Sequence, residues 1–141
     1  MHVLYFPELF FRALFFIEEM DRINEIKEKR DKIANYYDSK LTKLGCNIPR
    51  ITEGEIHGRY FYMFCCKKRN GLSKYLTNNG VENKIFYSPL TCDAAIYKNK
   101  VKLNLPNARK LLKKSLSIPL HENMTMKQAK YVVESIKKFY N

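Results

Sequence analysis

The chain has 141 residues, 45% of them hydrophobic, and a formal net charge of +12. This length fits one domain, and the apolar content argues against intrinsic disorder. The positive charge suits a nucleic acid, an acidic membrane or a phosphorylated substrate as partner, but an ordinary lysine-rich surface is the reading that we favour. The lysines are spread from Lys27 to Lys138 instead of forming a basic tail.

The first part of the chain, Val3–Ile17, is strongly apolar but contains Pro7, Glu8 and Arg12. It is shorter than the ~20 residues that a membrane-spanning helix needs, and it lacks the basic start and cleavage site of a signal peptide. We therefore expect a cytoplasmic protein without a membrane span. Because its apolar side chains cover more than one helix face, we also expect a partner or another domain to cover it, and self-association if nothing does.

The stretch Glu8–Leu44 contains no Gly or Pro and predicts one long helix. Gly45 follows at the position of a C-terminal cap. The apolar residues that recur at helical spacing are Ile17, Met20, Ile23, Ile26, Ile33, Tyr37, Leu41 and Leu44.

The middle of the chain alternates between strand and helix signals. Arg59–Lys67 is rich in aromatic residues and predicts a strand that is buried on both faces. Leu72–Asn79 predicts a short helix that ends at Gly80. Val81–Tyr87 predicts a second strand, which Ser88-Pro89 would break.

The last third begins with an irregular segment, Thr91–Asn104. Pro106 suits the first turn of a helix that runs to Lys114, and Ser115–Pro119 is a short extended piece. Thr125 and Gln128 have capping-box spacing for a last helix that ends at Tyr140. The whole order predicts an α+β fold with a long N-terminal helix and a small three-stranded sheet, antiparallel or mixed, flanked by helices.

Four cysteines are present: Cys46, Cys65, Cys66 and Cys92. They form no CxxC pair, and the adjacent Cys65 and Cys66 would point to opposite faces of a strand. We therefore expect free thiols in a reducing compartment and no metal site. The sequence also contains no Ser–His–Asp, paired-carboxylate or phosphate-loop pattern.

Four stretches carry a further pattern when they are taken in order. They are Asp21–Tyr37, with Ile33-Ala34 near its end; His57–Phe64; Leu76–Leu90, which contains Phe86-Tyr87-Ser88-Pro89; and Asn107–Arg109 with Leu116–His121 and Met124-Thr125. Their co-linear order resembles the C-terminal part of the DegT–DnrJ–StrS family of pyridoxal-phosphate-dependent sugar aminotransferases. The resemblance implies that residues 19–141 form the small C-terminal domain of a fold type I aminotransferase, preceded by an apolar start, 1–18, that is not family-like.

The resemblance also implies an enzyme that moves an amino group from an amino acid, commonly glutamate, to a keto-sugar nucleotide. The family's cofactor is held by a lysine of a larger N-terminal domain. No lysine of this sequence stands in that context, so we expect no catalytic or cofactor-binding residue here, no pyridoxal phosphate on this chain alone, and a truncated, inactive enzyme. The partners implied are the large domain or a second copy of the enzyme, together with a nucleotide sugar, and neither a metal nor nucleic acid.

For substrate binding, the resemblance points to Tyr87, Tyr97 and His57. Phe86 and Thr91 stand where the family commonly has histidines near the sugar, which weakens that expectation. Tyr87 is also consistent with an ordinary strand aromatic, and His57 with a loop residue. The alternative function is a basic binding module for nucleic acid or for a partner subunit, which rests only on charge and interleaved aromatic residues.

Overall fold

The computed structural model of the protein describes residues 7–97 and 103–141. In chain order its elements are α1 (Pro7–Asp21), α2 (Ile23–Leu41), η1 (Thr42–Leu44), β1 (Tyr62–Cys65), α3 (Arg69–Asn78), η2 (Thr91–Asp93), α4 (Pro106–Lys114), β2 (Ser115–Ile118) and α5 (Met126–Tyr140). The combination of helices with a small sheet confirms the predicted α+β class.

The sheet has two strands in the described part of the chain, so the prediction of three strands is wrong. β1 and β2 are antiparallel, with Tyr62 opposite Ile118 and Cys65 opposite Ser115. Tyr62 and Phe64 are buried whereas Met63 and Cys65 are half-buried. The predicted burial of this strand on both faces therefore holds fully for one face only.

The missing strand is the one expected at 81–87. Val81 is held by the end of α3, where its amide donates to the Leu76 carbonyl at 2.9 Å after Gly80 in the left-handed conformation. The Asn83 side chain bonds back to Ser73 of α3. Only Lys84 pairs with β2, through two hydrogen bonds with Ser117 of 3.0 and 2.8 Å. The segment thus touches the edge of the sheet at one residue and then leaves it.

The predicted long helix is divided at Arg22, between α1 and α2. The amide of Arg22 donates to Glu19, three residues back, so the α-helical ladder is interrupted there. No Gly or Pro marks this position. The predicted cap is confirmed, since Gly45 ends η1 with a φ of 73°.

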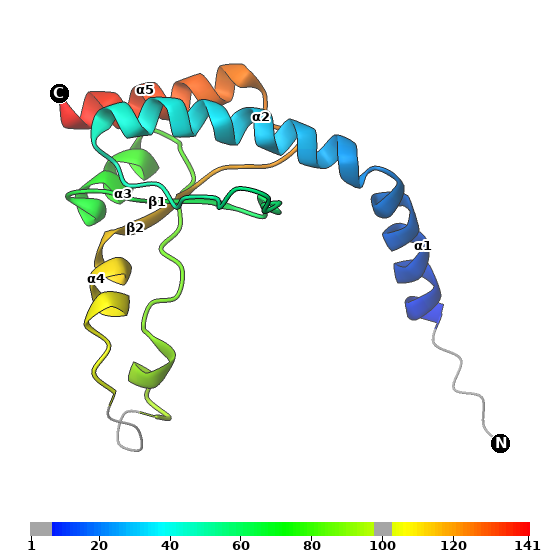
Figure 1. The fold of residues 1–141 in the computed structure, drawn as a ribbon, viewed down its shortest axis with the longest axis horizontal. Coiled ribbons are helices and arrows are strands. Elements are labelled where there is room, and N and C mark those ends of the chain that lie inside the picture. The colour runs from blue at the N-terminus through cyan, green and yellow to red at the C-terminus, as the bar shows by residue number, and fades with distance from the viewer. Residues whose placement is uncertain (1–6, 98–102) are drawn as a thin grey trace.

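Figure 1 shows α2 and α5 side by side on one side of the sheet, and the two helices contact each other. The predicted capping box of α5 is present, with Thr125 accepting from the Gln128 amide. The largest fully buried side chains are Tyr37, Leu41, Phe64, Leu72, Leu76, Leu116 and Ile136. They come from both helices, both strands and α3, so one core unites residues distant in sequence.

Two extensions leave this body on the same side of the molecule, away from α2 and α5 (Figure 1). One is α1, whose apolar residues are exposed. The other, here called the arm, comprises residues 85–97 and 103–114, with η2 and α4 along its length. In the described residues no helix combines the length and the apolar character needed to cross a membrane.

Candidate functional site

The three residues expected to face a substrate lie in two segments. His57 is in the loop before β1, where its Nδ1 accepts a hydrogen bond of 2.9 Å from the Arg59 amide. Tyr87 lies on the arm, 68% exposed and with a φ of +60°. Tyr97 follows η2 and is 40% exposed. A left-handed tyrosine that stands in solvent is not the ordinary strand aromatic that was the alternative for Tyr87.

An aromatic row joins the loop to the arm. Tyr60 packs edge-on against Phe61, Phe61 lies 5.0 Å from Phe86 between ring centroids, and Phe86 lies 6.1 Å from Tyr87. His57 lines a pocket of about 240 Å³ together with Tyr60 and Phe61. The structure therefore brings His57 and Tyr87 to the two ends of one row, whereas Tyr97 lies farther along the arm.

A second pocket, of about 330 Å³, shares Tyr60 and Phe61 with the first. Its lining includes Tyr60, Phe61, Phe86, Glu82 and His121. The pairing of Lys84 with Ser117 fixes the position of this pocket, because the pairing places Phe86 two residues beyond the edge of the sheet. The row and its two pockets, with apolar rings and a few polar groups, suit a ligand that has both ring faces and hydroxyl groups.

Arg59 anchors the loop that carries His57 and Tyr60. Its side chain is 9% exposed and lies 3.4 Å from a carboxylate oxygen of Asp31 and 3.4 Å from one of Asp38, both on α2. Its backbone has a φ of +48°, which is uncommon for a residue with a Cβ. Strain of this kind persists only where surrounding contacts hold the residue in place.

Two further contacts fix the same region. Arg30 donates from Nε and Nη2 to one oxygen of Glu122, at 3.0 and 2.8 Å. A backbone amide bond and this arginine lower the pKa of Glu122. Tyr62 donates to Asp38 at 2.6 Å, and burial, followed by this carboxylate, raises the pKa of its phenol. Tyr62 therefore serves as a neutral donor that holds β1 to α2.

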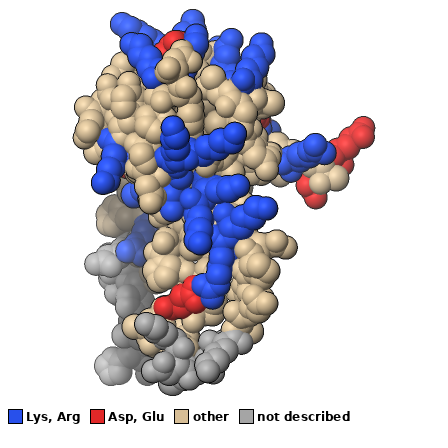
Figure 2. All heavy atoms as spheres, turned by 90° about the vertical axis from the view of Figure 1, so that its left-hand side faces the viewer, with Lys and Arg blue, Asp and Glu red and all other residues tan. Residues whose placement is uncertain are grey.

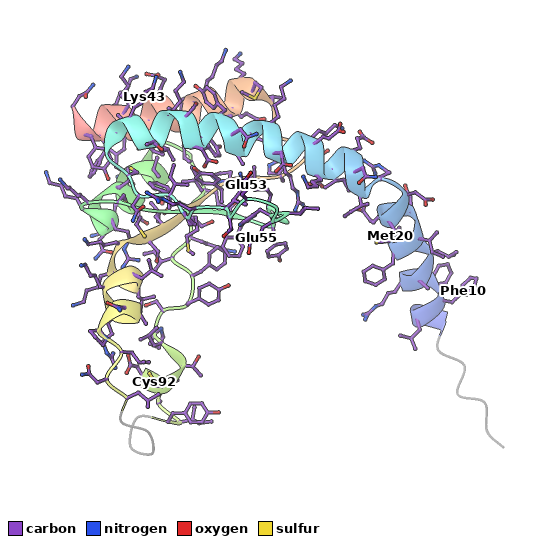
Figure 3. All side chains as sticks on the ribbon, viewed as in Figure 1. Phe10, Met20, Lys43, Glu53, Glu55 and Cys92 are labelled. Atoms are coloured by element: carbon purple, nitrogen blue, oxygen red, sulfur yellow. The ribbon has the colours of Figure 1, made fainter. Side chains whose placement is uncertain are left out.

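An ion pair stiffens the arm. Nη1 and Nη2 of Arg109, on α4, donate to the two carboxylate oxygens of Asp93, on η2. The bond from Nη2 to Oδ1 is 2.9 Å long. Hydrogen bonding to Arg109 lowers the pKa of Asp93. This pair ties together the two described halves of the arm. Figure 3 shows the neighbouring Cys92 at the far end of the arm and Glu53 and Glu55 on the loop beneath α2.

Sequence reasoning missed Arg59 and its partners. Asp31, Asn35 and Asp38 stand at helical spacing and form a polar stripe along α2, beside the apolar stripe. Such a stripe is a signal that a buried cation packs on the helix. Nothing in the sequence marked Arg59 as that cation, because its burial depends on the turn at residues 57–60.

The fold also collects lysines that are scattered along the sequence. Figure 2 shows lysine and arginine side chains on the face that includes α4. Lys67, Lys110 and Lys114 line a pocket of about 270 Å³ there, with Asn47 and Asn107. Among the described residues no carboxylate lies within ion-pair distance of these three lysines. This basic face lies apart from the aromatic row.

The described lysines do not fit a Schiff-base cofactor site. Such a site needs a lysine in a desolvated pocket, where its amine can act as a nucleophile. Lys27 is half-buried and paired with Asp31, and the other described lysines are exposed. No group of three or more His, Cys, Asp or Glu residues in the described ranges is arranged to hold a metal.

The sequence is similar to those of known proteins. Residues 11–137 match the DegT/DnrJ/EryC1/StrS aminotransferase family. A UDP-4-amino-4,6-dideoxy-N-acetyl-beta-L-altrosamine transaminase of Campylobacter jejuni is 30% identical over 139 residues, covering 88% of this chain and 36% of that protein. A GDP-perosamine synthase of Vibrio cholerae is 25% identical and covers 89% and 35%. This chain thus spans about a third of the length of these relatives.

Solved structures show the same fold. DesV of S. venezuelae, in complex with a ketimine intermediate, superposes with a TM-score of 0.86 at 18% identity, over 92% of this chain and 36% of that one. An aminotransferase of the same family from Brucella abortus gives 0.81 at 23% identity, over 89% and 34%. The family match begins at residue 11, inside α1, so the predicted boundary after residue 18 stays a prediction.

Proposed function

Because the chain belongs to the DegT/DnrJ/EryC1/StrS aminotransferase family, we propose that it is the small C-terminal part of a nucleotide-sugar aminotransferase. In the complete enzyme an amino group passes from an amino acid to a keto-sugar nucleotide. The observation that carries this proposal is the family match over residues 11–137. The aromatic row that joins the loop before β1 to the arm supports it.

The chemistry is divided between two parts. Pyridoxal phosphate supplies the electron sink and a lysine elsewhere in the enzyme holds it. The residues described here bind and orient the sugar nucleotide. His57 and Tyr87 stand at the ends of the aromatic row, and Tyr97 extends the surface along the arm. Alone, the 141 residues bind no cofactor and carry out no amino transfer.

The boundary between the family-like part and the apolar start belongs to this proposal as well. We place residues 19–141 in the small domain, with residues 1–18 outside it. The interruption of the helix at Arg22 supports a change of role near this point, because α1 makes few contacts with the body whereas α2 contributes to the core.

Complementation tests this function. The Campylobacter jejuni relative, of which this chain matches 36%, is divided into that matched part, which we take to be C-terminal as in the proposal, and the remaining N-terminal part. This chain is then co-expressed with that N-terminal part, and amino transfer is measured on the relative's own substrate. We expect transfer from the pair and from neither part alone. Tyr87→Ala in the pair should lower kcat/KM on the order of tenfold, whereas Tyr131→Ala, which changes an exposed tyrosine on α5, should not.

The relative's own C-terminal part, supplied separately in the same way, is the positive control. If that part restores transfer and this chain binds the N-terminal part without restoring it, the proposed function is wrong.

A further inference from the structure

Two buried cysteines lie on either side of a backbone bridge beside the end of the sheet. Cys46 follows the left-handed Gly45, and Cys66 follows β1. Both belong to the hydrophobic core, with exposures of 8% and 4%. The backbone between them is fixed by a bridge of two residues, Asn47 and Cys65, that pair in antiparallel fashion.

The hydrogen bonds determine how Cys46 and Cys66 are placed. Asn47 and Cys65 exchange both of their backbone bonds, at 2.9 and 2.8 Å. The amides of Cys46 and Cys66 point outward instead, to the Leu41 carbonyl at 3.1 Å and the Lys114 carbonyl at 3.0 Å. The two cysteines therefore flank this isolated bridge at positions that, in an antiparallel ladder, form a non-hydrogen-bonded pair whose side chains share one face.

This position has the dimensions of a disulfide. Opposite residues of a non-hydrogen-bonded pair have Cα atoms about 4.5 Å apart, and disulfides span about 4.4–6.8 Å between Cα atoms. Burial, followed by the neighbouring Cys66 and Cys65, raises the pKa of Cys46 to about 11. Cys65 alternates to the other face of the strand, and Cys92 lies on the arm.

We propose that Cys46 and Cys66 form a cross-strand disulfide when a small disulfide such as oxidised glutathione is present. One thiolate attacks the oxidant, which releases a reduced glutathione and leaves a mixed disulfide on the protein. The second thiol loses its proton, displaces the remaining glutathione and completes the S–S bond. Both protein thiols are oxidised and one glutathione disulfide is reduced to two thiols.

The bond closes the segment 46–66 into a ring that contains the loop of His57 and Arg59. This loop has no regular structure between η1 and β1 and depends on Arg59 for its anchoring. Closing the ring removes conformational freedom from the unfolded chain. Burial keeps both thiols protonated at neutral pH, so the reaction is slow there and faster in alkaline buffer.

Peptide mapping of the whole chain tests the proposal. The folded protein is incubated with oxidised glutathione in alkaline buffer, its remaining thiols are alkylated, and it is digested with trypsin. Cys46 lies in peptide 44–50, Cys65 and Cys66 in peptide 60–67, and Cys92 in peptide 85–98. We expect 44–50 linked to 60–67, and a thermal midpoint raised on the order of 10 °C until dithiothreitol reverses it.

The variant Cys65→Ser assigns the bond, because Cys66 is then the only thiol in peptide 60–67. The link should persist in Cys65→Ser and Cys92→Ser and disappear in Cys46→Ser. Glutathione on the half-buried Cys92 of the wild type shows that the oxidant acted. The proposal is overturned if Cys92 is modified while 44–50 and 60–67 remain unlinked, or if the link vanishes in Cys65→Ser.

Discussion

At the scale of single residues, Arg59 organises the candidate site. It is a buried cation with two carboxylate partners on α2, and it stands in a left-handed turn beside His57 and Tyr60. Removing its side chain would take the Arg59 cation from Asp31, which keeps Lys27, and from Asp38, which keeps the Tyr62 hydroxyl. The loss of two ion pairs in a partly buried setting is costly. The position of the loop therefore depends on this one side chain.

At position 59 we expect the glycine variant to be more stable than the alanine variant, the reverse of the order at most positions. We expect Arg59→Ala to lower the free energy of unfolding by about 2–3 kcal/mol. Arg59→Gly should lower it by about 1 kcal/mol less, since glycine adopts a positive φ without strain. Urea denaturation of both variants measures the difference, with Arg50→Ala, an exposed arginine of the same loop, as the near-neutral control.

A glycine variant less stable than the alanine variant would contradict the backbone assignment. Equal stability of wild type and Arg59→Ala would contradict the anchoring role altogether. The alanine and glycine variants lose the same ion pairs, so a difference in their stability reports on the backbone conformation at position 59.

Much of this site was beyond the reach of sequence patterns. Tyr87 and His57 were identified through a resemblance, and the structure places them on one aromatic row. Phe61 and Phe86, which connect them, had been assigned to two strands of a sheet. Their contact depends on the chain leaving the sheet after Lys84, and that departure depends on the side-chain bonds of Asn83. The side-chain hydrogen bonds of Asn83 compete with the backbone hydrogen bonds of a strand, and the periodicity of the sequence does not show which of the two will form.

At the scale of elements, strong local signals predicted structure well. The capping box at Thr125, the proline at the start of α4 and the glycine after η1 all lie where the sequence put them. The division between α1 and α2 was missed because neither Gly nor Pro marks Arg22. The third strand was predicted wrongly because a short run of strand-forming residues looks the same whether or not a neighbour pairs with it.

The exposed helix α1 leads to a prediction about association. Phe10 and Phe15 are 65% and 68% exposed, and Figure 3 shows Phe10 and Met20 projecting from α1. An apolar surface of this kind drives contact with another copy. We expect light scattering to show the 141-residue chain as a dimer or larger, and Phe10→Ser with Phe15→Ser to return it to the monomer with unchanged helix content.

The control for this experiment is Ile56→Ser. Ile56 is 83% exposed but stands in the loop before β1, away from α1. The Ile56→Ser chain should associate as the wild type does. A monomeric wild-type chain at the same concentration would show that α1 does not drive association.

At the scale of the whole molecule, the surface has apolar regions and a basic region. Exposed apolar side chains occur on α1, on the loop before β1 and along the arm, and the lysines Lys67, Lys110 and Lys114 lie together around α4, which is part of that arm. One core holds α2, α5, α3 and both strands together, so the body has its own stability. The chain spans about a third of its relatives' length, and the apolar extensions are where we propose that the rest of the enzyme packs.

The central claim is the proposal that this chain contributes a substrate surface and does not itself hold the cofactor. The purified chain is mixed with pyridoxal phosphate, reduced with borohydride to fix any Schiff base, and mapped by mass spectrometry. We predict only scattered, substoichiometric labelling of exposed lysines. Stoichiometric labelling of one lysine would contradict the claim.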